Sequence, residues 1–539
     1  MVYIGNMARW LLHHQCSVYP LSTSTKYIQR HHRSIGTILH QNTQSQYHYS
    51  HHQYSTKHIT TAAVANNNTS NSDTIPLGCL TRQFIDYSLY NHQNGYFNNQ
   101  QRIINTINKI NWSTVTSKQQ YIKILDALYS SSDTAWLTPV ELYQPYYGYT
   151  ICNWLLEKYL GECHIYTNQL SQLSQLSPDK FKPFNIIEIG GGTGTLCCNV
   201  LDYIQNTYPC IYDQIQYTII DYSVRLHKLQ HTALYKHINN NRVILQNKSA
   251  VDITAPDNVH SSVNCVIGIE VLDNMSHDKL IQRNNQLYQT HVYQHGIQPS
   301  HKLHNTIQYN TNTDLSLDYY EIYDNVHDPA IVDWLNLTID YNDKYEENRY
   351  YHTLKQKNFD QHAALYISSL GDQLTNKIMN HTTDDTLTQY IPTTALQFLQ
   401  ALIRHIPSHH ILLGDFYYLP NTIVGQNAPI VSSKQNGQTI DESTYLSNLG
   451  KSDIFFPTNF QQLLYVYNKL IQQQHTNTNN TSIQHPNNNK QSIGTVYSNY
   501  EFMKKYAKDD NNIVINSMFG YKSYRPMNED YINFRYISI

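Results

Sequence analysis

The chain has 539 residues, which is more than one hydrophobic core usually organises, so we expect one large domain with insertions or two domains with tails. Its 37 Lys and Arg residues nearly balance its 40 Asp and Glu residues, giving a formal net charge of -3. This balance argues against a nucleic-acid-binding protein, which would carry a basic surface. No run of about 18 apolar residues predicts a transmembrane helix.

Residues 1–75 predict a mitochondrial transit peptide followed by a disordered linker. No Asp or Glu occurs before Asp73, although Ser, Thr and His are frequent there. The basic residues of this segment are Arg9, Lys26, Arg30, Arg33 and Lys57. Such a composition is typical of transit peptides, because the membrane potential acts on their positive charge. The alternative is a disordered, Asn-rich tail of a cytosolic protein.

The rest of the chain predicts a doubly wound α/β fold with a mostly parallel sheet. Residues 76–180 show apolar residues at helical spacing and predict an N-terminal helical cap. From residue 181 onward, short apolar segments alternate with helical stretches, which is typical of parallel strands joined by crossovers. The predicted strands are residues 184–190, 217–221, 242–246, 263–270 and 410–416.

Two inserts interrupt the predicted sheet. Residues 181–278 form the first part of the core, whereas residues 279–394 are too polar and irregular for one crossover and predict an inserted subdomain. Residues 395–539 complete the core, beginning with a helix at 395–406 and ending with a strand in YINFRYISI. Within this last part, residues 472–492 predict a low-complexity insert.

A glycine-rich turn follows the first predicted strand. Gly190, Gly192 and Gly194 separate the strand from a helical pattern, so a ligand can approach main-chain amides at the helix start. The spacing does not match the dinucleotide fingerprint. Glu188 would repel a pyrophosphate but suits a ligand with an ammonium and a sulfonium. We therefore expect S-adenosyl-L-methionine as the cofactor and disfavour a nicotinamide-dependent oxidoreductase.

A second acid, Asp221, ends the next predicted strand. A carboxylate at this position can accept hydrogen bonds from both hydroxyls of a ribose. The alternative is that Asp221 only caps the following helix, but Ser223 is available for that role. The cofactor-binding prediction therefore includes Glu188, Asp221 and the three glycines.

Histidine and cysteine residues lack the spacing of metal ligands. The chain has 29 His and 8 Cys residues, but pairs such as His51-His52 lie in polar low-complexity sequence and no Cys-x-x-Cys occurs. We therefore expect no metal site. Packing against the sheet explains the adjacent Cys197 and Cys198 more simply than redox chemistry, which is the alternative.

With these residues in hand, the chain resembles the mitochondrial protein-arginine methyltransferases that assist respiratory complex I assembly, and their bacterial MidA-like relatives. The similar segments are residues 81–97, 136–149, 188–196 and 415–431. The resemblance implies a class I, Rossmann-like methyltransferase fold, S-adenosyl-L-methionine as cofactor and a protein arginine as substrate. It also implies action in the mitochondrial matrix on a complex I subunit or another mitochondrial protein.

The family shows an Asn-Glu-x-x-Asp-Ala-x-Pro element after the fourth strand, which corresponds to residues 269–276 here. Glu270 and Asp273 keep its two acids, whereas Asn and Pro are replaced. Carboxylates beside the methyl group can orient a planar guanidinium, so we predict both acids as catalytic residues. A solvated loop or helix cap is the alternative, and His277 is expected to be incidental.

Two functional hypotheses remain open at this point. The first is an enzyme that methylates a protein arginine. The second is a non-catalytic assembly factor that keeps the methyltransferase fold and acts by binding a partner. The retained acids favour the enzyme, whereas the replaced family residues keep the second hypothesis open.

Overall fold

The computed structural model describes thirteen stretches of the chain. They are residues 78–98, 110–131, 138–166, 173, 175–283, 286–296, 318–345, 387–435, 438–447, 449–478, 493–508, 513–515 and 523–539. Contacts divide the chain into Trp10–Thr74 and a larger unit, to which all of these residues belong. The predicted transit peptide and linker, residues 1–75, lie outside the described residues.

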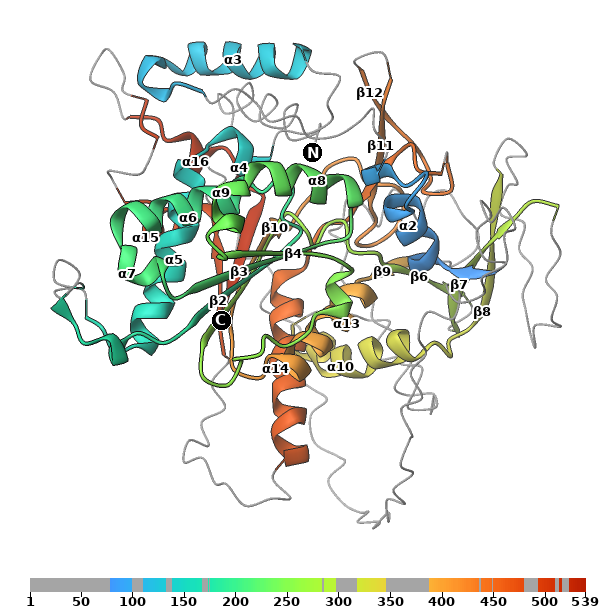
Figure 1. Ribbon diagram of the computed structural model, residues 1–539. Helices are drawn as coiled ribbons and strands as arrows, with labels where there is room; N and C mark the ends of the chain where they lie inside the picture. The colour runs from blue at the N-terminus through green and yellow to red at the C-terminus, as the bar shows by residue number, and fades with distance from the viewer. Residues whose placement is uncertain are drawn as a thin grey trace, which may run out of the picture. The chain divides into compact units, whose positions relative to one another are not determined.

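The main sheet has seven strands and is mostly parallel (Figure 1). Its order is β14 (Thr495–Ser498), β15 (Phe534–Ser538), β10 (His410–Phe416), β5 (Val263–Ile269), β2 (Phe184–Ile189), β3 (Ile215–Asp221) and β4 (Val243–Asn247). The five strands from β10 to β4 are parallel, and β15 runs antiparallel to both of its neighbours. The predicted parallel strands and the terminal strand are confirmed. The chain order reverses between β2 and β5, which is where open α/β sheets bind ligands.

Both faces of this sheet are buried. Ile186 and Ile187 are neighbours on β2, yet they belong to two different hydrophobic clusters. This follows from the alternation of side chains along a strand and explains why every residue of β2 and β5 is buried. Cys197 is fully buried in the first cluster, which supports the packing interpretation of the cysteine pair.

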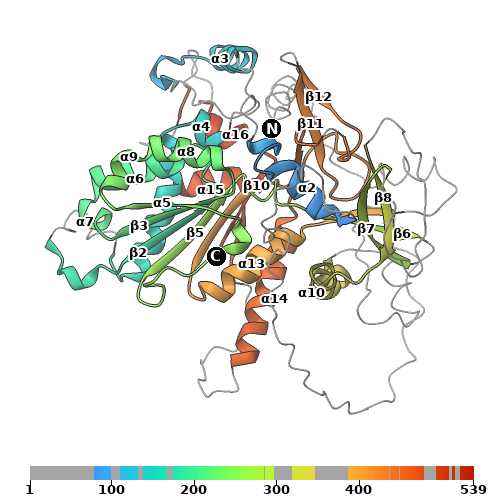
Figure 2. The ribbon, with the colours of Figure 1, turned by 45° about the vertical axis from the view of Figure 1, so that its right-hand side comes forward.

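Helices cover the two faces (Figures 1 and 2). The first cluster includes residues of α5 (Tyr146–Glu162), α6 (Thr195–Thr207), α7 (Pro209–Tyr212), α15 (Asn499–Tyr506) and α16 (Pro526–Glu529). The second includes residues of α10 (Pro329–Tyr345), α13 (Thr393–His405) and α14 (Phe460–Thr478). The predicted helix at 395–406 is therefore confirmed as α13. The low-complexity insert at 472–492 stays a prediction; α14 continues into its first residues, to Thr478.

Shorter elements connect these helices and strands. They are η2 (Trp112–Thr114), α3 (Lys118–Ser131), α4 (Pro139–Leu142), η4 (Pro178–Lys180), α8 (Val224–Ala233), α9 (Tyr235–Asn239) and η5 (Ala250–Asp252). No helix in the described stretches combines the length and apolar character needed to cross a membrane.

The chain between β5 and β10 supplies four of the five strands of a second, antiparallel sheet, and β1 from the N-terminal part of the chain pairs with β7 (Figure 2). Its strands are β1 (Cys79–Leu80), β6 (Asp278–Arg283), β7 (Gln286–Gln294), β8 (Tyr319–Asn325) and β9 (Leu387–Ile391). A third sheet contains β11 (Ile430–Gln435), β12 (Gln438–Asp441) and β13 (Asp453–Phe455). The exact limits of an inserted subdomain stay a prediction.

The N-terminal helices pack in two different places. Residues of α2 (Thr81–Tyr90) and η1 (Tyr96–Asn98) form a third hydrophobic cluster with residues of β7, β9 and β13. In contrast, α5 contacts α6 and β5 of the main sheet. The predicted helical cap over residues 76–180 is thus distributed over two packing regions, and its limits also stay a prediction.

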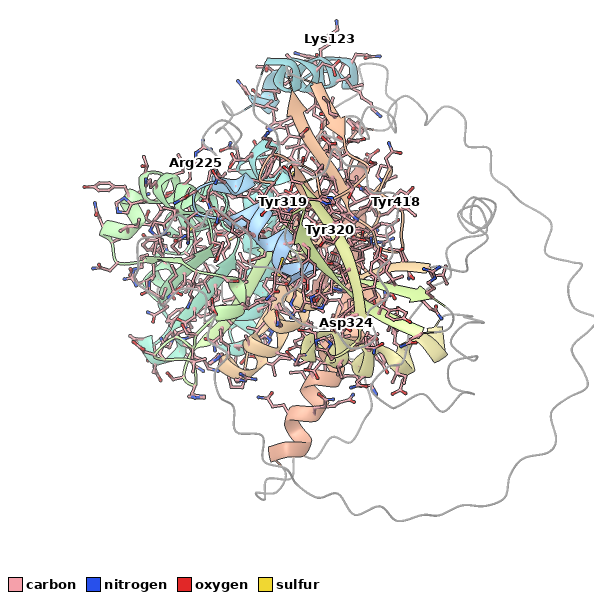
Figure 3. The ribbon with its side chains drawn as sticks, turned by 90° about the vertical axis from the view of Figure 1, so that its right-hand side faces the viewer. Lys123, Arg225, Tyr319, Tyr320, Asp324 and Tyr418 are labelled. Carbon is pink, nitrogen blue, oxygen red and sulfur yellow. The ribbon has the colours of Figure 1, made fainter. Side chains whose placement is uncertain are left out.

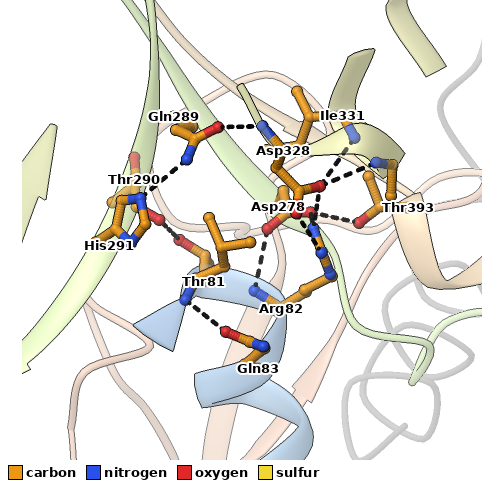
Figure 4. Close-up of polar contacts among 12 residues, drawn as sticks. Thr81, Arg82, Gln83, Asp278, Gln289, Thr290, His291, Asp328, Ile331 and Thr393 are labelled. Atoms are coloured by element: carbon orange, nitrogen blue, oxygen red, sulfur yellow. Dashed lines mark hydrogen bonds and ion pairs between the residues drawn. The ribbon is translucent and has the colours of Figure 1, made fainter. Parts of the chain in front are cut away.

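Arg82 on α2 joins several of these elements (Figure 4). Its guanidinium pairs with Asp278 of β6 and donates to both carboxylate oxygens of Asp328, at 2.8 and 2.7 Å. Asp278 also accepts a hydrogen bond of 2.6 Å from Thr393 of α13. Asp328 accepts the backbone N–H groups of Ala330 and Ile331 and so caps α10. Arg82 therefore connects α2 to β6, α10 and, through Asp278, α13.

Replacing Arg82 should destabilise the fold. In Arg82→Gln, the carboxylate of Asp278 stays 1% exposed but loses its cation. Removing one partner of a buried ion pair costs about 3 to 5 kcal/mol, so we expect a loss of that size in the free energy of unfolding. Equilibrium denaturation in urea measures it.

The matched control is Lys182→Gln, which breaks the exposed pair with Glu162 (3.8 Å). Exposed pairs contribute about 0 to 1 kcal/mol, so this variant should be nearly as stable as the parent. Equal losses in the two variants would contradict the role given to Arg82.

Candidate active site

The glycine-rich turn joins β2 to α6. Gly190, Gly192 and Gly194 all have positive φ angles, of 69, 53 and 87°, which L side chains rarely adopt. Gly191 is needed for a different reason, because a Cβ atom there would lie 2.5 Å from the side chain of Ile219 on β3. The predicted strand, turn and helix are confirmed, and the turn is held close to the neighbouring strand.

Glu188 lies near the end of β2 and is buried. Its Oε2 atom accepts a hydrogen bond of 2.9 Å from the hydroxyl of Tyr217 on β3. Burial raises the pKa of Glu188 to about 7, although this hydrogen bond opposes the shift. The side chain is therefore poised to become an anion when a cation lies beside it.

Asp221 ends β3, as predicted, and is also buried. Its carboxylate accepts the backbone N–H of Ser223 at 2.9 Å and the side-chain amide of Gln230 at 3.2 Å. Ser223 caps α8 by accepting the N–H of Leu226, so the helix does not depend on Asp221 for its cap. Burial raises the pKa of Asp221 to about 6.

Gln230 is a positioning residue that the sequence did not predict. Its amide group donates to the carbonyl of Gly192 at 2.9 Å as well as to Asp221. One side chain on α8 thereby ties the glycine turn to the acid of the next strand. A polar residue on the buried face of a predicted amphipathic helix was the available signal.

Glu270 follows β5 in a left-handed backbone conformation, with a φ of 54°. Its backbone N–H donates to the carbonyl of Gly414 on β10 at 2.8 Å. Both of its carboxylate oxygens are buried and accept no hydrogen bond from the part of the chain that the structure describes. Burial and the nearby Asp415 raise the pKa of Glu270 well above its ordinary value. A strained non-glycine residue with a bare carboxylate is typical of a functional position.

Asp273 lies deeper, with 1% of its surface exposed, and its carboxylate oxygens accept no hydrogen bond from the residues described above. Its backbone N–H donates to Asp415 at 3.0 Å and its carbonyl accepts the N–H of Phe456 at 2.8 Å. Burial raises the pKa of Asp273 well above its ordinary value, and the charges of Asp415, Asp453 and Glu270 add to the shift. The sequence did not predict Asp415 or Asp453.

An open cavity of about 940 Å³ brings most of these residues together. It lies at the carboxyl ends of β2, β3 and β5, and further walls come from α2, η1 and the α4 region. Its lining consists of Tyr90, Phe97, Thr138, Val140, Glu141, Glu188, Gly190, Gly191, Gly192, Thr193, Thr195, Leu196, Asp221, Ser223, Leu226, Ile269, Glu270, Val271, Asn274 and Asp453. Gly194 and Asp273 do not border it.

Two segments that carried the family resemblance also meet at this cavity. Phe97 stacks on Tyr90, with ring centroids 5.4 Å apart. Glu141 accepts a hydrogen bond from Thr193 of the glycine turn. His277, in contrast, lies outside the cavity lining, stacks on Phe456 and uses its Nδ1 atom on the carbonyl of Met275. Burial lowers the pKa of His277 to about 3, which fits the interpretation that it is incidental.

Residues 166–477 match a protein family described as "Putative S-adenosyl-L-methionine-dependent methyltransferase". The match spans more than half of the 539 residues and includes the glycine turn, Asp221, Glu270 and Asp453. The chain belongs to this family. S-adenosyl-L-methionine is accordingly the cofactor, as the sequence predicted.

Individual relatives are more distant. The chain is 24% identical over 271 residues to "Protein arginine methyltransferase NDUFAF7 homolog, mitochondrial" of Schizosaccharomyces pombe, which covers 49% of this chain and 50% of that protein. It therefore spans about half the length of this curated relative. Two crystal structures from Burkholderia thailandensis, one bound to S-adenosyl-homocysteine, share 10% identity over 86% of this chain and 87% of theirs, with TM-scores of 0.43 and 0.40.

The cavity residues fit the cofactor of the family. S-adenosyl-L-methionine carries an ammonium, a sulfonium and a ribose diol and no phosphate. Glu188 would offer negative charge to the cationic end of the cofactor, and Asp221 would offer a carboxylate to the diol. The glycine turn would hold the cofactor against main-chain amides. When bound, the cofactor supplies an activated methyl group.

Gly192→Val should block cofactor binding. A Cβ atom on Gly192 would meet no protein atom within 4 Å, so a valine side chain would project into open space at a residue that lines the cavity. We expect a loss of S-adenosyl-L-methionine affinity of at least roughly tenfold, by calorimetry.

Gly296→Val is the matched control, because Gly296 also has a positive φ, of 85°, and open space around its Cβ position but does not line the cavity. It should share the backbone strain and keep the affinity. Unchanged affinity in a folded Gly192→Val variant would place the cofactor elsewhere.

Cofactor affinity should rise with pH between about 5.5 and 7.5. The pKa values of Asp221 and Glu188 in the free protein are about 6 and about 7, and cationic and hydroxyl groups favour the ionised carboxylates. Binding must therefore displace protons at low pH, and affinity falls as pH falls through these pKa values. Calorimetry across this pH range measures the effect.

Two variants assign the pH dependence. Glu188→Gln should remove the part of the pH dependence that lies near pH 7, because this side chain no longer titrates. Tyr217→Phe removes the hydrogen bond that lowers the pKa of Glu188, so the curve should move to higher pH. An affinity independent of pH in the parent protein would show that neither acid faces the cofactor.

Proposed function

We propose that this chain is a protein-arginine N-methyltransferase of the mitochondrial matrix that assists the assembly of respiratory complex I. The family match supports the methyltransferase activity, and the similarity to the mitochondrial protein arginine methyltransferase homolog of Schizosaccharomyces pombe supports arginine as substrate and the mitochondrion as location. The role in complex I assembly and the complex I subunit as substrate rest on the family resemblance of the sequence.

The bare carboxylate of Glu270 is the observation that carries the arginine proposal. This group lines the cofactor cavity, is buried, and receives no hydrogen bond from any of the described residues. A buried anion without a partner is costly, so the site favours a cation with N–H donors. A guanidinium provides a planar set of donors and can satisfy both oxygens of one carboxylate.

Asp453 and Asp273 extend this acidic region. Asp453 lines the same cavity and accepts a hydrogen bond of 2.9 Å from the side-chain amide of Asn274. Its carboxylate can still accept further hydrogen bonds from a ligand in the cavity. Asp273 lies behind Glu270 and has unsatisfied carboxylate oxygens. In the proposal, Glu270 and Asp453 contact the guanidinium, and Asp273 adds negative charge that stabilises it.

The residues supply positioning and proton transfer. An arginine nitrogen that gains a methyl group must lose a proton, and a carboxylate with a raised pKa is suited to accept it. Burial raises the pKa of Glu270, so this group can both orient the substrate and take up the proton.

Removal of either predicted catalytic acid should reduce methylation more than cofactor binding. Glu270→Gln and Asp273→Asn preserve shape and remove charge. We expect methylation to fall by about ten- to a thousandfold, equivalent to about 1.5 to 4 kcal/mol, with cofactor affinity within about threefold of the parent. Mass spectrometry of methylated mitochondrial proteins and calorimetry with S-adenosyl-L-methionine provide the two measurements.

Asp213→Asn is the control, because Asp213 is exposed and outside the cavity lining. Loss of cofactor binding together with activity would assign Glu270 or Asp273 to the cofactor pocket. Normal methylation by both variants would show that the guanidinium assignment is wrong.

The alternative is a non-catalytic assembly factor that retains the fold. It predicts that Glu270→Gln and Asp273→Asn support complex I assembly in a deletion strain as well as the parent does. The enzyme hypothesis predicts that assembly and methylation fall together while partner binding stays intact.

A further inference from the structure

A second group of polar residues lies on the antiparallel sheet, outside the methyltransferase cavity. His291 is on β7, Asp324 is on β8, and His327 follows β8 just before α10. One side-chain ligand atom from each of them lies within 4.8 Å of the other two. Figure 3 shows Asp324 on its strand, and Figure 4 shows His291 beside Gln289.

Gln289 fixes how the two imidazole rings are protonated. Its Oε1 atom accepts the backbone N–H groups of His327 and Asp328, both at 2.9 Å, so the amide nitrogen is the opposite end of the group. That nitrogen lies 2.9 Å from Nε2 of His291 and 3.3 Å from Nε2 of His327. An amide nitrogen only donates, so both Nε2 atoms must be acceptors.

The other ring nitrogens agree with this assignment. Nδ1 of His291 lies 3.0 Å from the carbonyl of Gly78, and Nδ1 of His327 lies 2.9 Å from the carbonyl of Asn325. A carbonyl only accepts, so each Nδ1 carries the proton. Both rings therefore direct an Nε2 lone pair at one point, where the partly positive amide nitrogen of Gln289 now sits.

We propose that His291, His327 and Asp324 bind a divalent transition-metal ion of the zinc class. Two imidazole nitrogens and one carboxylate are a ligand set typical of such ions. Metal-bound histidines usually donate their second N–H to a backbone carbonyl or a carboxylate, and both rings already do so. To bind the ion, the Gln289 side chain must move away from the two Nε2 atoms and give up its bonds to the N–H groups of His327 and Asp328, and water completes the coordination.

The position of the site assigns it a stabilising role. His327 directly precedes Asp328, which caps α10 and pairs with Arg82. A bound ion would connect β7, β8 and the start of α10, and none of its three ligands lines the cofactor cavity. Binding of the ion and resistance to unfolding, rather than methylation, are therefore the appropriate measurements.

A second group in the described residues, Cys198, Asp202 and His237, fits an ion less well. The ammonium of Lys236 lies 2.8 Å from Oδ1 of Asp202, and His237 lies 3.3 Å from the same oxygen. A cation already occupies the central carboxylate of that group. No such ammonium is among the contacts described for Asp324.

The experiment compares metal binding by the full chain and by the variant His291→Gln/His327→Gln. Histidines elsewhere in this His-rich chain will add weak binding, so the difference between the proteins is the quantity of interest. We expect the parent to bind one more Zn²⁺ in the tight class, and Zn²⁺ to raise the unfolding temperature of the parent only. The control His231→Gln/His260→Gln removes two exposed histidines and should behave as the parent.

Co²⁺ as a spectroscopic probe identifies the ligands. The proposed site has no thiolate, so its Co²⁺ spectrum should show ligand-field bands without a thiolate charge-transfer band, and the bands should be lost in the double variant. A thiolate band in the tight class would place the ion at Cys198 and overturn the proposal. So would equal stoichiometry and equal Zn²⁺ stabilisation in parent and double variant.

A single variant tests the proposal even if the double variant misfolds. The side chain of His327 is 63% exposed, so His327→Gln should fold normally. It should weaken Zn²⁺ binding at the tight site by about ten- to a hundredfold. Unchanged Zn²⁺ affinity in this variant would also overturn the proposal.

Discussion

The contact between α2 and the segment that follows the Glu270 loop is the interaction on which the site depends. Arg82, Asp86 and Tyr90 are four residues apart and share one face of the helix. Arg82 pairs with Asp278, Asp86 accepts from the hydroxyl of Ser276, and Tyr90 donates to the carbonyl of Asn274. The helix thereby lies along residues 274–278 and fixes the chain just after Glu270 and Asp273.

This contact couples the second sheet to the cofactor cavity. Arg82 anchors one end of the helix to α10 and β6, whereas Tyr90 at the other end forms a wall of the cavity. A change that loosens Arg82 therefore reaches the cavity through one helix. The antiparallel sheet, which holds none of the predicted cofactor residues, thus contributes to the shape of the cavity.

The carboxylates on either side of this contact belong to two classes, which differ in whether a cation of the protein pairs with them. Asp278 and Asp328 are buried or half-buried with a guanidinium of the protein beside them. The carboxylates of Glu270 and Asp273 are buried, and no described residue donates a hydrogen bond to them. The first class stabilises the fold, whereas the second costs stability until a cation arrives, which is the pattern of a binding site.

Local sequence patterns predicted the parts of the site that local physics determines. A strand, three glycines with positive φ and a following helix are encoded within residues 184–207, and the acid at the tip of β3 follows the same logic. Asp453 could not be predicted in this way, because its partner Asn274 lies in a distant segment. Gln230 left a local signal, a polar residue on a buried helix face, but its contact with Gly192 depends on tertiary packing. Asp415 did leave a signal, since it lies near the end of a predicted strand as Asp221 does.

The left-handed turn at Glu270 depends on β10, which follows it by more than a hundred residues. Gly414 accepts the backbone N–H of Glu270, and Asp415 accepts the backbone N–H of Asp273. Two consecutive residues of β10 therefore hold both ends of the loop from Glu270 to Asp273. The parallel pairing of β5 with β10 brings these residues into register, with Gly414 opposite Ile269. The chain between β5 and β10 can therefore build a second sheet without disturbing the loop, because the main-sheet ladder sets the loop geometry.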